Sequence, residues 1–363
     1  MTEIIRIHLT PNQFTEKESI VVEKGEFTAS CFRFQSGVCA IRLKNSLGEL
    51  VMLPYQGQQI WDVTMRGRRL TMKSMFDQPY PTHSFLHTFG GFFQHCGATA
   101  MGVPGPEDKH QLHGDLPVAQ YQSAFLELGE DQQGSFISLG GNYRHTMAFN
   151  NNYLAAPRVK LYAGSSVFHV SLTVTNLKKT PMPLMYMAHI NFRPVDDGRL
   201  VSTVKADPEH MRVRAAFPDF MEVDPSFRSF VEDLKAHPEK HMILSPEMKY
   251  DPEVVLFVDY EADADGWAHS LQIHPDGSAD VVRHRTDQLG RSGRWICRTP
   301  DQDALGIEPG TAEGTGFNSE KAKGNVKYLN AGEQFETHMQ IGVLTAEEAR
   351  LEEQRIQKLV KAD

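Results

Sequence analysis

Cysteine is scarce in this chain, whose 363 residues include only Cys31, Cys39, Cys96 and Cys297. No two of them form a Cys-x-x-Cys pair, which excludes a disulfide-built scaffold and gives no support to a structural zinc site. The sequence therefore predicts four free thiols that serve as small core residues.

Long hydrophobic runs and dense runs of basic residues are also missing. The longest apolar stretches, Val51–Pro54 and Val254–Val258, fall far short of the roughly 20 residues that a membrane-spanning helix needs. Glu3, Arg6 and His8 interrupt the apolar segment that a signal peptide requires. The 46 acidic and 37 basic residues give a formal charge of −9, without a basic track for a phosphate backbone. We expect a cytoplasmic protein with neither a nucleic-acid nor a membrane partner.

The apolar residues that are present alternate with polar ones, as in half-buried β-strands. In Val167–Thr175, the side chains of Phe168, Val170, Leu172 and Val174 fall on one face. Similar runs, separated by turn signals, occur at Val38–Leu43, Arg158–Tyr162, Glu253–Asp259 and His338–Leu344. Many short strands predict an all-β fold, and specifically a β-sandwich.

Helical periodicity is limited to two segments. Phe227–Ala236 is short, whereas Thr345–Lys361 opens with a Thr-x-x-Glu capping box and predicts a C-terminal surface helix. No repeat, low-complexity tract or linker divides the chain, so we expect a single domain over residues 1–363. The largest irregular regions are Gly90–Leu116 and Pro194–Pro252, and long loops of this kind commonly carry function.

Sixteen histidines are many for this length, and two of them stand where an imidazole could do chemistry. His113 precedes Gly114, whose backbone freedom can bring the ring to the wall of a site. His189 ends an apolar strand and is followed by Asn191, so that two polar groups share one strand face. A histidine that is merely hydrogen-bonded within the core remains the alternative for His189.

Glu308 is the carboxylate that the sequence singles out. It ends a short apolar run and precedes Pro309 and Gly310. A carboxylate at such a strand end is partly removed from water, which makes it more basic. A capping or loop carboxylate is the alternative role.

The order of several short elements resembles the aldose 1-epimerase (galactose mutarotase-like) superfamily. These elements are Leu112–Gly114, Pro183–Phe192, Ser292–Arg294, Glu308–Pro309 and Leu329–Glu333. The resemblance spans residues 25–345 and is closest to the branch named aldose 1-epimerase family protein, in which segments like Leu53–Trp61 and Leu70–Ser74 precede the His-Gly loop.

This resemblance implies a large antiparallel β-sandwich with a carbohydrate cleft, and an isomerase that interconverts sugar anomers. It implies that Glu308 removes the proton of the anomeric hydroxyl group and that His189 protonates the ring oxygen. His113 would bind or polarise the sugar. Mutarotation needs one proton removed at O1 and one delivered to O5, so a carboxylate and an imidazole on opposite sides of the sugar suffice. No metal or organic cofactor is required.

The chain departs from the better-known galactose mutarotases at two places. Their Gly-Arg-x-x-Asn-Arg element corresponds here to Gly90–Gly97, which lacks the sugar-binding arginine. They also place Asn before the catalytic histidine and Tyr after it, where this chain has Ala188 and Ile190. The identity of the sugar is therefore not given by the resemblance.

Aromatic and polar side chains are the candidates for sugar contacts, because pyranose rings stack on aromatic groups and hydroxyl groups need polar partners. The candidates are Trp61, Arg66, Lys73, His95, Asn191, Asp259 and Arg294. Each of them could equally be a structural or surface residue. If two of the cations point inward, they favour an acidic or phosphorylated sugar as the small-molecule partner.

Two other readings compete with an epimerase. The first is a metal-dependent sugar isomerase or lyase in which His95, His110 and His113 bind the ion, because imidazole suits zinc, manganese or iron. The second is a non-catalytic sugar-binding protein that keeps the fold and not the chemistry. The enzyme reading requires Glu308 and His189 to line one pocket with room for a pyranose.

Overall fold

Two antiparallel sheets form most of the structure. The computed structural model describes residues 4–214, 217, 223–248 and 250–361. Within these residues, one sheet has nine strands, in the order β1 (Ile5–Leu9), β9 (Ser123–Asp131), β10 (Gly134–Met147), β11 (Asn151–Tyr162), β12 (Val167–Asn176), β22 (Gln334–Leu344), β18 (Ala279–Arg285), β17 (Trp267–Ile273) and β14 (Arg199–Ser202).

The second sheet has thirteen strands in the described part of the chain. Eleven follow the order β15 (Met211–Val213), β16 (Val254–Val258), β19 (Arg291–Arg298), β20 (Asp303–Gly310), β13 (Met182–Phe192), β8 (Phe93–Ala98), β6 (Ile60–Met65), β5 (Gly48–Met52), β4 (Cys39–Asn45), β3 (Phe27–Arg33) and β2 (Ser19–Lys24). The short strands β7 (Arg68–Arg69) and β21 (Lys327–Leu329) pair with β6 and β13. The predicted all-β fold, a large antiparallel β-sandwich, is confirmed.

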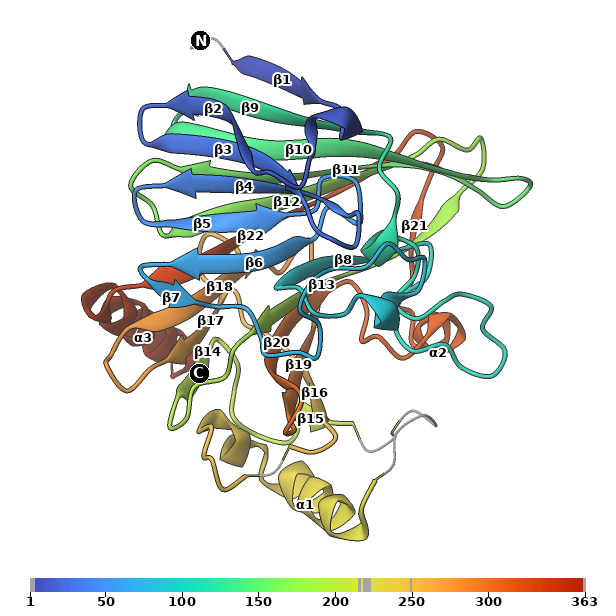
Figure 1. The fold of residues 1–363 in the computed structure, drawn as a ribbon. Helices are drawn as coiled ribbons and strands as arrows, with labels where there is room; N and C mark the ends of the chain where they lie inside the picture. The colour runs from blue at the N-terminus through green and yellow to red at the C-terminus, as the bar shows by residue number, and fades with distance from the viewer. Residues whose placement is uncertain (1–3, 215–216, 218–222, 249, 362–363) are drawn as a thin grey trace.

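The hydrophobic core lies between the sheets. Figure 1 shows the blue strands β2–β6 lying over the green strands β9–β12, and the largest buried cluster draws side chains from both layers. In β12 the burial alternates residue by residue, and Phe168, Val170, Leu172 and Val174 are the buried members. The apolar alternation of this segment therefore predicted both the strand and its inward face.

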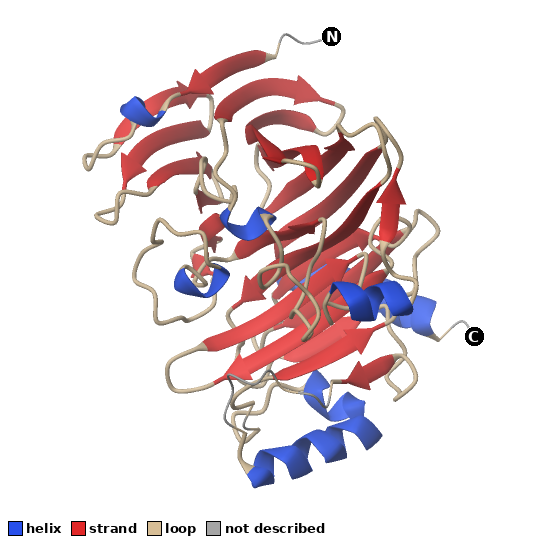
Figure 2. Ribbon diagram, turned by 90° about the vertical axis from the view of Figure 1, so that its right-hand side faces the viewer, coloured by secondary structure: helices blue, strands red, loops and turns tan. Residues whose placement is uncertain are grey.

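The helices lie at the margins of the sheets (Figure 2). They are α1 (Pro225–Ala236), α2 (Phe317–Ala322) and α3 (Ala346–Val360), with short 3₁₀ turns η1 (Pro11–Gln13), η2 (Phe85–His87), η3 (Leu116–Val118) and η4 (Pro238–Met242). The predicted capping box starts α3, where the Thr345 hydroxyl accepts a hydrogen bond from the Glu348 amide at 3.3 Å. The two predicted helices are confirmed, whereas α2 was not foreseen.

One segment expected to be irregular contains a central strand. Gly90–Leu116 includes β8, whose six residues are all buried and which pairs with β13 and β6. Its sequence has no strand-like alternation, because both faces of β8 are covered and Gln94 and His95 lie inside the protein. Pro194–Pro252 likewise contains β14, β15, α1 and η4, and its positions 215–216, 218–222 and 249 lie outside the described residues.

Among the described helices, none combines the length and the apolar character needed to cross a membrane.

The core packing makes a prediction about Phe168, whose side chain is fully buried between the sheets. Phe168→Ala should lower the free energy of unfolding by about 3–5 kcal/mol, because it removes a buried ring and leaves a cavity. Urea denaturation of the full chain measures the loss. The control is Thr173→Ala, on the half-exposed face of the same strand. An equal loss of unfolding free energy in the two variants would contradict the view that the Phe168 face of β12 forms the core.

Candidate functional site

A cavity of about 370 Å³ lies over four neighbouring strands of the larger sheet. Strands β13, β20, β19 and β16 supply its floor, and the loops that flank β8 supply much of its wall. Its lining consists of Met75, Phe85, Leu86, Phe89, Val103, Leu112, His113, Met187, His189, Arg214, Pro252, Glu253, Val255, Phe257, Trp295, Cys297, Thr299, Asp301, Gln302, Glu308, Glu313 and Gly314.

Strand register brings His189 and Glu308 together. The pairing of β13 with β20 is antiparallel, with Met187 opposite Gly310 and Ile190 opposite Ile307, so His189 and Glu308 lie opposite each other. The distance from His189 Nε2 to Glu308 Oε1 is 3.3 Å. Both side chains project from the same sheet face into the cavity, although 119 positions separate them in the sequence.

Two glycines leave room for the Glu308 carboxylate. Gly293 is paired with Glu308 across β19 and β20, and Gly306 lies two residues before it. A Cβ atom added at either glycine would come within 2.7 Å of a carboxylate oxygen of Glu308. The Ser-Gly-Arg element therefore matters to the site through its glycine, which lets the carboxylate lie flat against the sheet.

A hydrogen bond from behind fixes the orientation of the His189 ring. Asn191 Nδ2 donates to the Gly91 carbonyl at 3.0 Å, which turns Asn191 Oδ1 toward His189 Nδ1 at 2.6 Å. Because Oδ1 can only accept, Nδ1 carries the hydrogen and Nε2 of the neutral ring presents a lone pair to Glu308. Asn191 is fully buried and does not line the cavity, so the structure places it as a partner of His189.

Burial shifts the pKa values of the two groups in opposite directions. Loss of water raises the pKa of Glu308 to about 8, and the negative charge of Glu253 adds to the rise while Arg214 opposes it. Loss of water lowers the pKa of His189 to about 4, against the effects of Asn191 and Glu253. At neutral pH Glu308 is therefore protonated and His189 is neutral.

His113 reaches the same cavity from the loop after β8. Its φ of 59° is in the left-handed region, and Gly114 follows with a φ of 80°. A Cβ atom at Gly114 would lie 2.3 Å from the Ala100 carbonyl oxygen, so the loop needs glycine there. The His113 ring centroid lies 5.5 Å from that of His189, and burial holds its pKa well below the usual range. His113, His189 and Glu308 thus line one cavity, as expected, and their catalytic roles stay predictions.

Aromatic rings surround His189 and remove it from water. The ring centroids of Phe89 and Trp295 lie 5.1 Å and 5.5 Å from that of His189, and Phe85 lies at 6.2 Å. These three rings are not among the candidates that the sequence singles out. Trp295 lies two residues after Gly293, and side chains two positions apart on a strand share one sheet face, so this spacing was a usable signal.

An ion pair borders His189 and Glu308. Arg214 binds the carboxylate of Glu253, and Glu253 Oε2 also accepts a hydrogen bond from Trp295 Nε1 at 2.7 Å. All three side chains line the cavity. No sequence pattern indicates this pair, because Arg214 follows β15 and Glu253 precedes β16, and the two residues meet only in the folded chain.

The sequence matches one family of proteins. A family model with the description "Domain of unknown function (DUF4432)" matches residues 35–343. The chain belongs to this family. No curated protein matches the sequence at a significant level.

Solved structures show which fold this DUF4432 member has. A provisionally assigned aldose 1-epimerase from Klebsiella pneumoniae superposes with a TM-score of 0.83 at 15% identity, over 99% of this chain and 96% of the other. A galactose mutarotase-like protein from Clostridium acetobutylicum gives 0.58 at 13% identity, over 88% and 99%. A provisionally assigned mutarotase from Salmonella typhimurium gives 0.58 at 10% identity, over 90% and 97%. The chain has the galactose mutarotase-like fold.

In this DUF4432 protein, three of the predicted sugar contacts lie away from the cavity within the fold. Trp61 is buried in a separate apolar cluster with Leu53. His95 is fully buried and its Nδ1 lies 2.8 Å from the Tyr186 hydroxyl. Arg294, on the opposite face of β19 from Trp295, donates to the Ser202 hydroxyl at 3.0 Å.

The two remaining predicted cations also lie outside the cavity lining. Arg66 donates to the Ser166 hydroxyl at 3.0 Å, and the exposed Lys73 donates to the Pro300 carbonyl at 2.6 Å. The structure therefore does not supply the two inward cations on which the expectation of an acidic or phosphorylated sugar depended.

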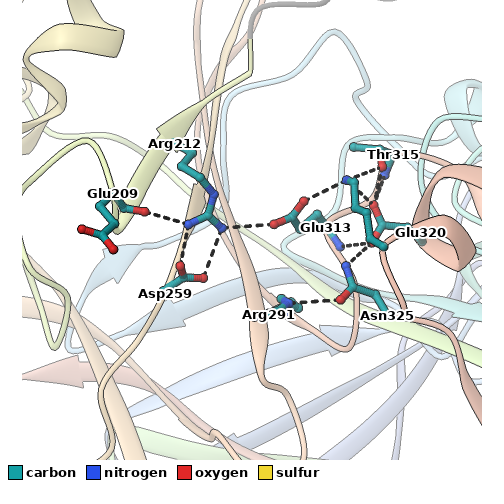
Figure 3. A network of polar contacts seen from close by, with 9 residues as sticks. Glu209, Arg212, Asp259, Arg291, Glu313, Thr315, Glu320 and Asn325 are labelled. Atoms are coloured by element: carbon teal, nitrogen blue, oxygen red, sulfur yellow. Dashed lines mark hydrogen bonds and ion pairs between the residues drawn. The ribbon is translucent and has the colours of Figure 1, made fainter.

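Asp259 belongs to a polar network beside the cavity (Figure 3). Its carboxylate binds Arg212, whose Nη2 donates to Glu313 Oε1 at 3.1 Å. Lys323 donates to the other oxygen of Glu313 at 2.8 Å and also contacts the fully buried Glu320. Glu313 lines the cavity and Asp259 does not, so Asp259 is linked to the cavity lining only through Arg212.

The histidines of the metal-dependent alternative do not form a ligand set. His110 Nδ1 lies 2.8 Å from the Gln111 carbonyl oxygen, whereas His95 is bonded to Tyr186 inside the sheet. In the part of the chain that the structure describes, no group of three His, Cys, Asp or Glu side chains is arranged to hold a metal ion.

The shifted pKa of Glu308 makes a prediction about stability. The folded protein keeps a proton on Glu308 up to about pH 8, whereas the unfolded chain releases it near 4.5. The Glu308 carboxyl group thus binds more protons in the folded state in this window, so its contribution to the free energy of unfolding falls as pH rises, by up to roughly 1.4 kcal/mol per pH unit. Urea denaturation between pH 5 and 8 should show the free energy of unfolding of the native chain falling relative to that of Glu308→Gln. Parallel pH dependences in the two proteins would contradict the shift.

Proposed function

We propose that this protein is a cofactor-free carbohydrate epimerase of the aldose 1-epimerase type, which interconverts sugar anomers by acid–base ring opening. The observation that carries the proposal is the 3.3 Å contact between His189 and Glu308 on the cavity floor, with opposite pKa shifts on the two groups. A carboxyl group and an imidazole that share one proton can accept a proton at one atom and deliver one at another.

The placement of the two groups differs from the sequence-based picture. That picture put acid and base on opposite sides of the sugar, whereas the contact between His189 and Glu308 puts them side by side on one wall. This arrangement suits the reaction, because the two atoms that exchange protons, O1 and O5, are both bonded to C1. One pair of neighbouring groups can therefore serve both oxygens without movement of the sugar.

The proton balance of ring opening follows from the resting pair. When the sugar binds, the shared proton moves from Glu308 to His189, which leaves a carboxylate base and an imidazolium acid. Glu308 then takes the proton of the O1 hydroxyl group while His189 Nε2 gives its proton to O5. The C1–O5 bond breaks, C1=O1 forms, and the pair is again in its resting state. Rotation about C1–C2 and the reverse transfers close the ring to the other anomer.

His113 has a different part in this proposal. Its ring lies beside His189, and its Nδ1 atom is buried without a hydrogen-bond partner among the described residues. A buried polar atom of this kind is satisfied when a ligand brings a partner. We assign His113 to holding and polarising the sugar.

The proposal predicts the effects of three substitutions. Glu308→Gln should abolish most anomer interconversion and leave sugar binding largely intact, because the amide keeps the shape and cannot accept the O1 proton. His189→Asn should also slow turnover, and the expected loss for either is about 10²–10⁴-fold. His113→Asn should weaken binding at least as much as turnover. Polarimetry or NMR of anomerically pure sugars gives the rate above the spontaneous rate, and calorimetry gives the affinity.

The outcome that removes Glu308 from its role is near-native turnover in Glu308→Gln. Sugar binding without any acceleration by the native protein would instead favour the non-catalytic sugar-binding alternative.

The proposal also predicts the pH dependence of the rate. Below about pH 4 a second proton occupies His189 while Glu308 keeps its own, so the base is lost. Above about pH 8 Glu308 releases the shared proton, so the acid is lost. The rate of anomer exchange, corrected for the spontaneous rate at each pH, should form a plateau between these limits. A rate that increases steadily up to pH 10 would contradict a shared proton.

A further inference from the structure

The polar side chains of the cavity, apart from the reacting groups, are largely bonded to other protein groups. Glu253 accepts from Arg214 and Trp295. Glu313 accepts from Arg212 and Lys323, one at each oxygen. Each oxygen of these two carboxylates therefore already accepts one hydrogen bond from the protein and has one lone pair left.

The remaining polar groups lie toward the rim. The Thr299 hydroxyl accepts from the Gln302 amide at 3.0 Å and donates to the Gln302 carbonyl at 3.3 Å, so it is occupied as well. Asp301 is exposed to solvent and Gln302 is half-buried. Hydroxyl groups of the sugar can therefore find partners at His189 and Glu308, at the remaining lone pairs of the two carboxylates, and at the rim.

The floor between them is apolar. Beyond Glu308, the neighbouring strands β19 and β16 present Trp295, Cys297, Val255 and Phe257 to the cavity. Met187 lies on the other side of the pair, two residues before His189 on β13. A hydroxyl group pressed against such a floor would lose its water and gain no partner, whereas a methyl or methylene group would gain contact area.

The charges of the cavity lining also favour an uncharged sugar. Among the described residues that line the cavity, Arg214 is the sole Lys or Arg, and Glu253 already binds it. A phosphate, sulfonate or carboxylate group is normally held by cations, and the cation of this lining is already paired with a carboxylate.

We propose that the sugar is an uncharged deoxy sugar, whose C–H group in place of a hydroxyl group faces Val255, Phe257 and Cys297. This inference rests on the proposed function for the site at which the sugar binds, and it adds the substrate class. It replaces the earlier expectation of an acidic or phosphorylated sugar with one that the cavity wall can accommodate.

The test compares sugars that differ in one group. Calorimetric affinities are measured for D-galactose with 6-deoxy-D-galactose, for D-glucose with its 6-deoxy and 2-deoxy forms, and for D-galactose 6-phosphate. At least one deoxy sugar should bind about 10- to 100-fold tighter than its parent, and the phosphate should bind weakest. Parents that bind as tightly as every deoxy partner, or a phosphate that binds tightest, would overturn the inference.

A variant tests the floor directly. Val255→Thr keeps the shape of the side chain and replaces a methyl group with a hydroxyl group. This group can bond a hydroxyl group of the parent sugar, so the preference for the deoxy sugar should fall about tenfold. Val22→Thr, on the distant edge strand β2, is the matched control and should leave the preference unchanged. Cys297→Ser makes the same change from the neighbouring strand if Val255→Thr does not fold. An unchanged preference in a folded floor variant would contradict the proposed contact.

The two proposals fail in different ways. Tight binding of a deoxy sugar without faster anomer exchange would leave this inference standing and contradict the proposed function. Anomer exchange with no preference for a deoxy sugar would do the reverse.

Discussion

The contact between His189 and Glu308 is the constraint to which the surrounding structure responds. Two ionisable side chains face each other across neighbouring strands at the bottom of a cavity, and each is less than a tenth exposed. Such a pair is tolerated only if its charges are kept low or its hydrogen bonds are complete. Asn191 completes the bond at the back of the ring, and the two flanking glycines leave the carboxylate free to face the imidazole.

Sharing one proton lowers the cost of burying this pair. A carboxylate and an imidazolium ion together would lose much hydration in so dry a place, whereas a carboxyl group and a neutral imidazole lose far less. The same burial that raises the pKa of Glu308 lowers that of His189, so both shifts stabilise the uncharged state. The charged state remains reachable because the two atoms that would exchange the proton are 3.3 Å apart. Stability and acid–base chemistry thus depend on the same contact.

The sequence predicts the fold better than the site. Strands such as β12 follow from alternation, because one of their faces is buried and the other is half-exposed. Strand β8 does not, since it is covered on both faces and carries Gln94 and His95 inside. The sequence did predict that His113, His189 and Glu308 are neighbours. Each of them lies in a short motif, and these motifs occur in the same order as in the family that the chain resembles.

The rest of the site depends on contacts that no local pattern records. Arg66, Lys73 and Arg294 looked like sugar-binding cations, and the folded chain uses them on hydroxyl and carbonyl groups of its own. The cation that does reach the cavity is Arg214, which follows the short edge strand β15 and binds Glu253, just before the neighbouring strand β16. Whether an Arg or Lys side chain reaches the cavity depends on its neighbours in the folded chain. The spacing of charged residues along the sequence does not reveal those neighbours.

The charges around the cavity act on the pair of His189 and Glu308 in opposite directions. Glu253 favours a proton on both Glu308 and His189, and Arg214 opposes it at Glu308. Because Arg214 and Glu253 bind each other, their fields largely cancel at a distance. Glu313 binds Arg212 and Lys323, which also bind Asp259 and Glu320, so that this network holds three carboxylates and two cations. Burial, rather than any one of these charges, is therefore the largest influence on the pKa values of both Glu308 and His189.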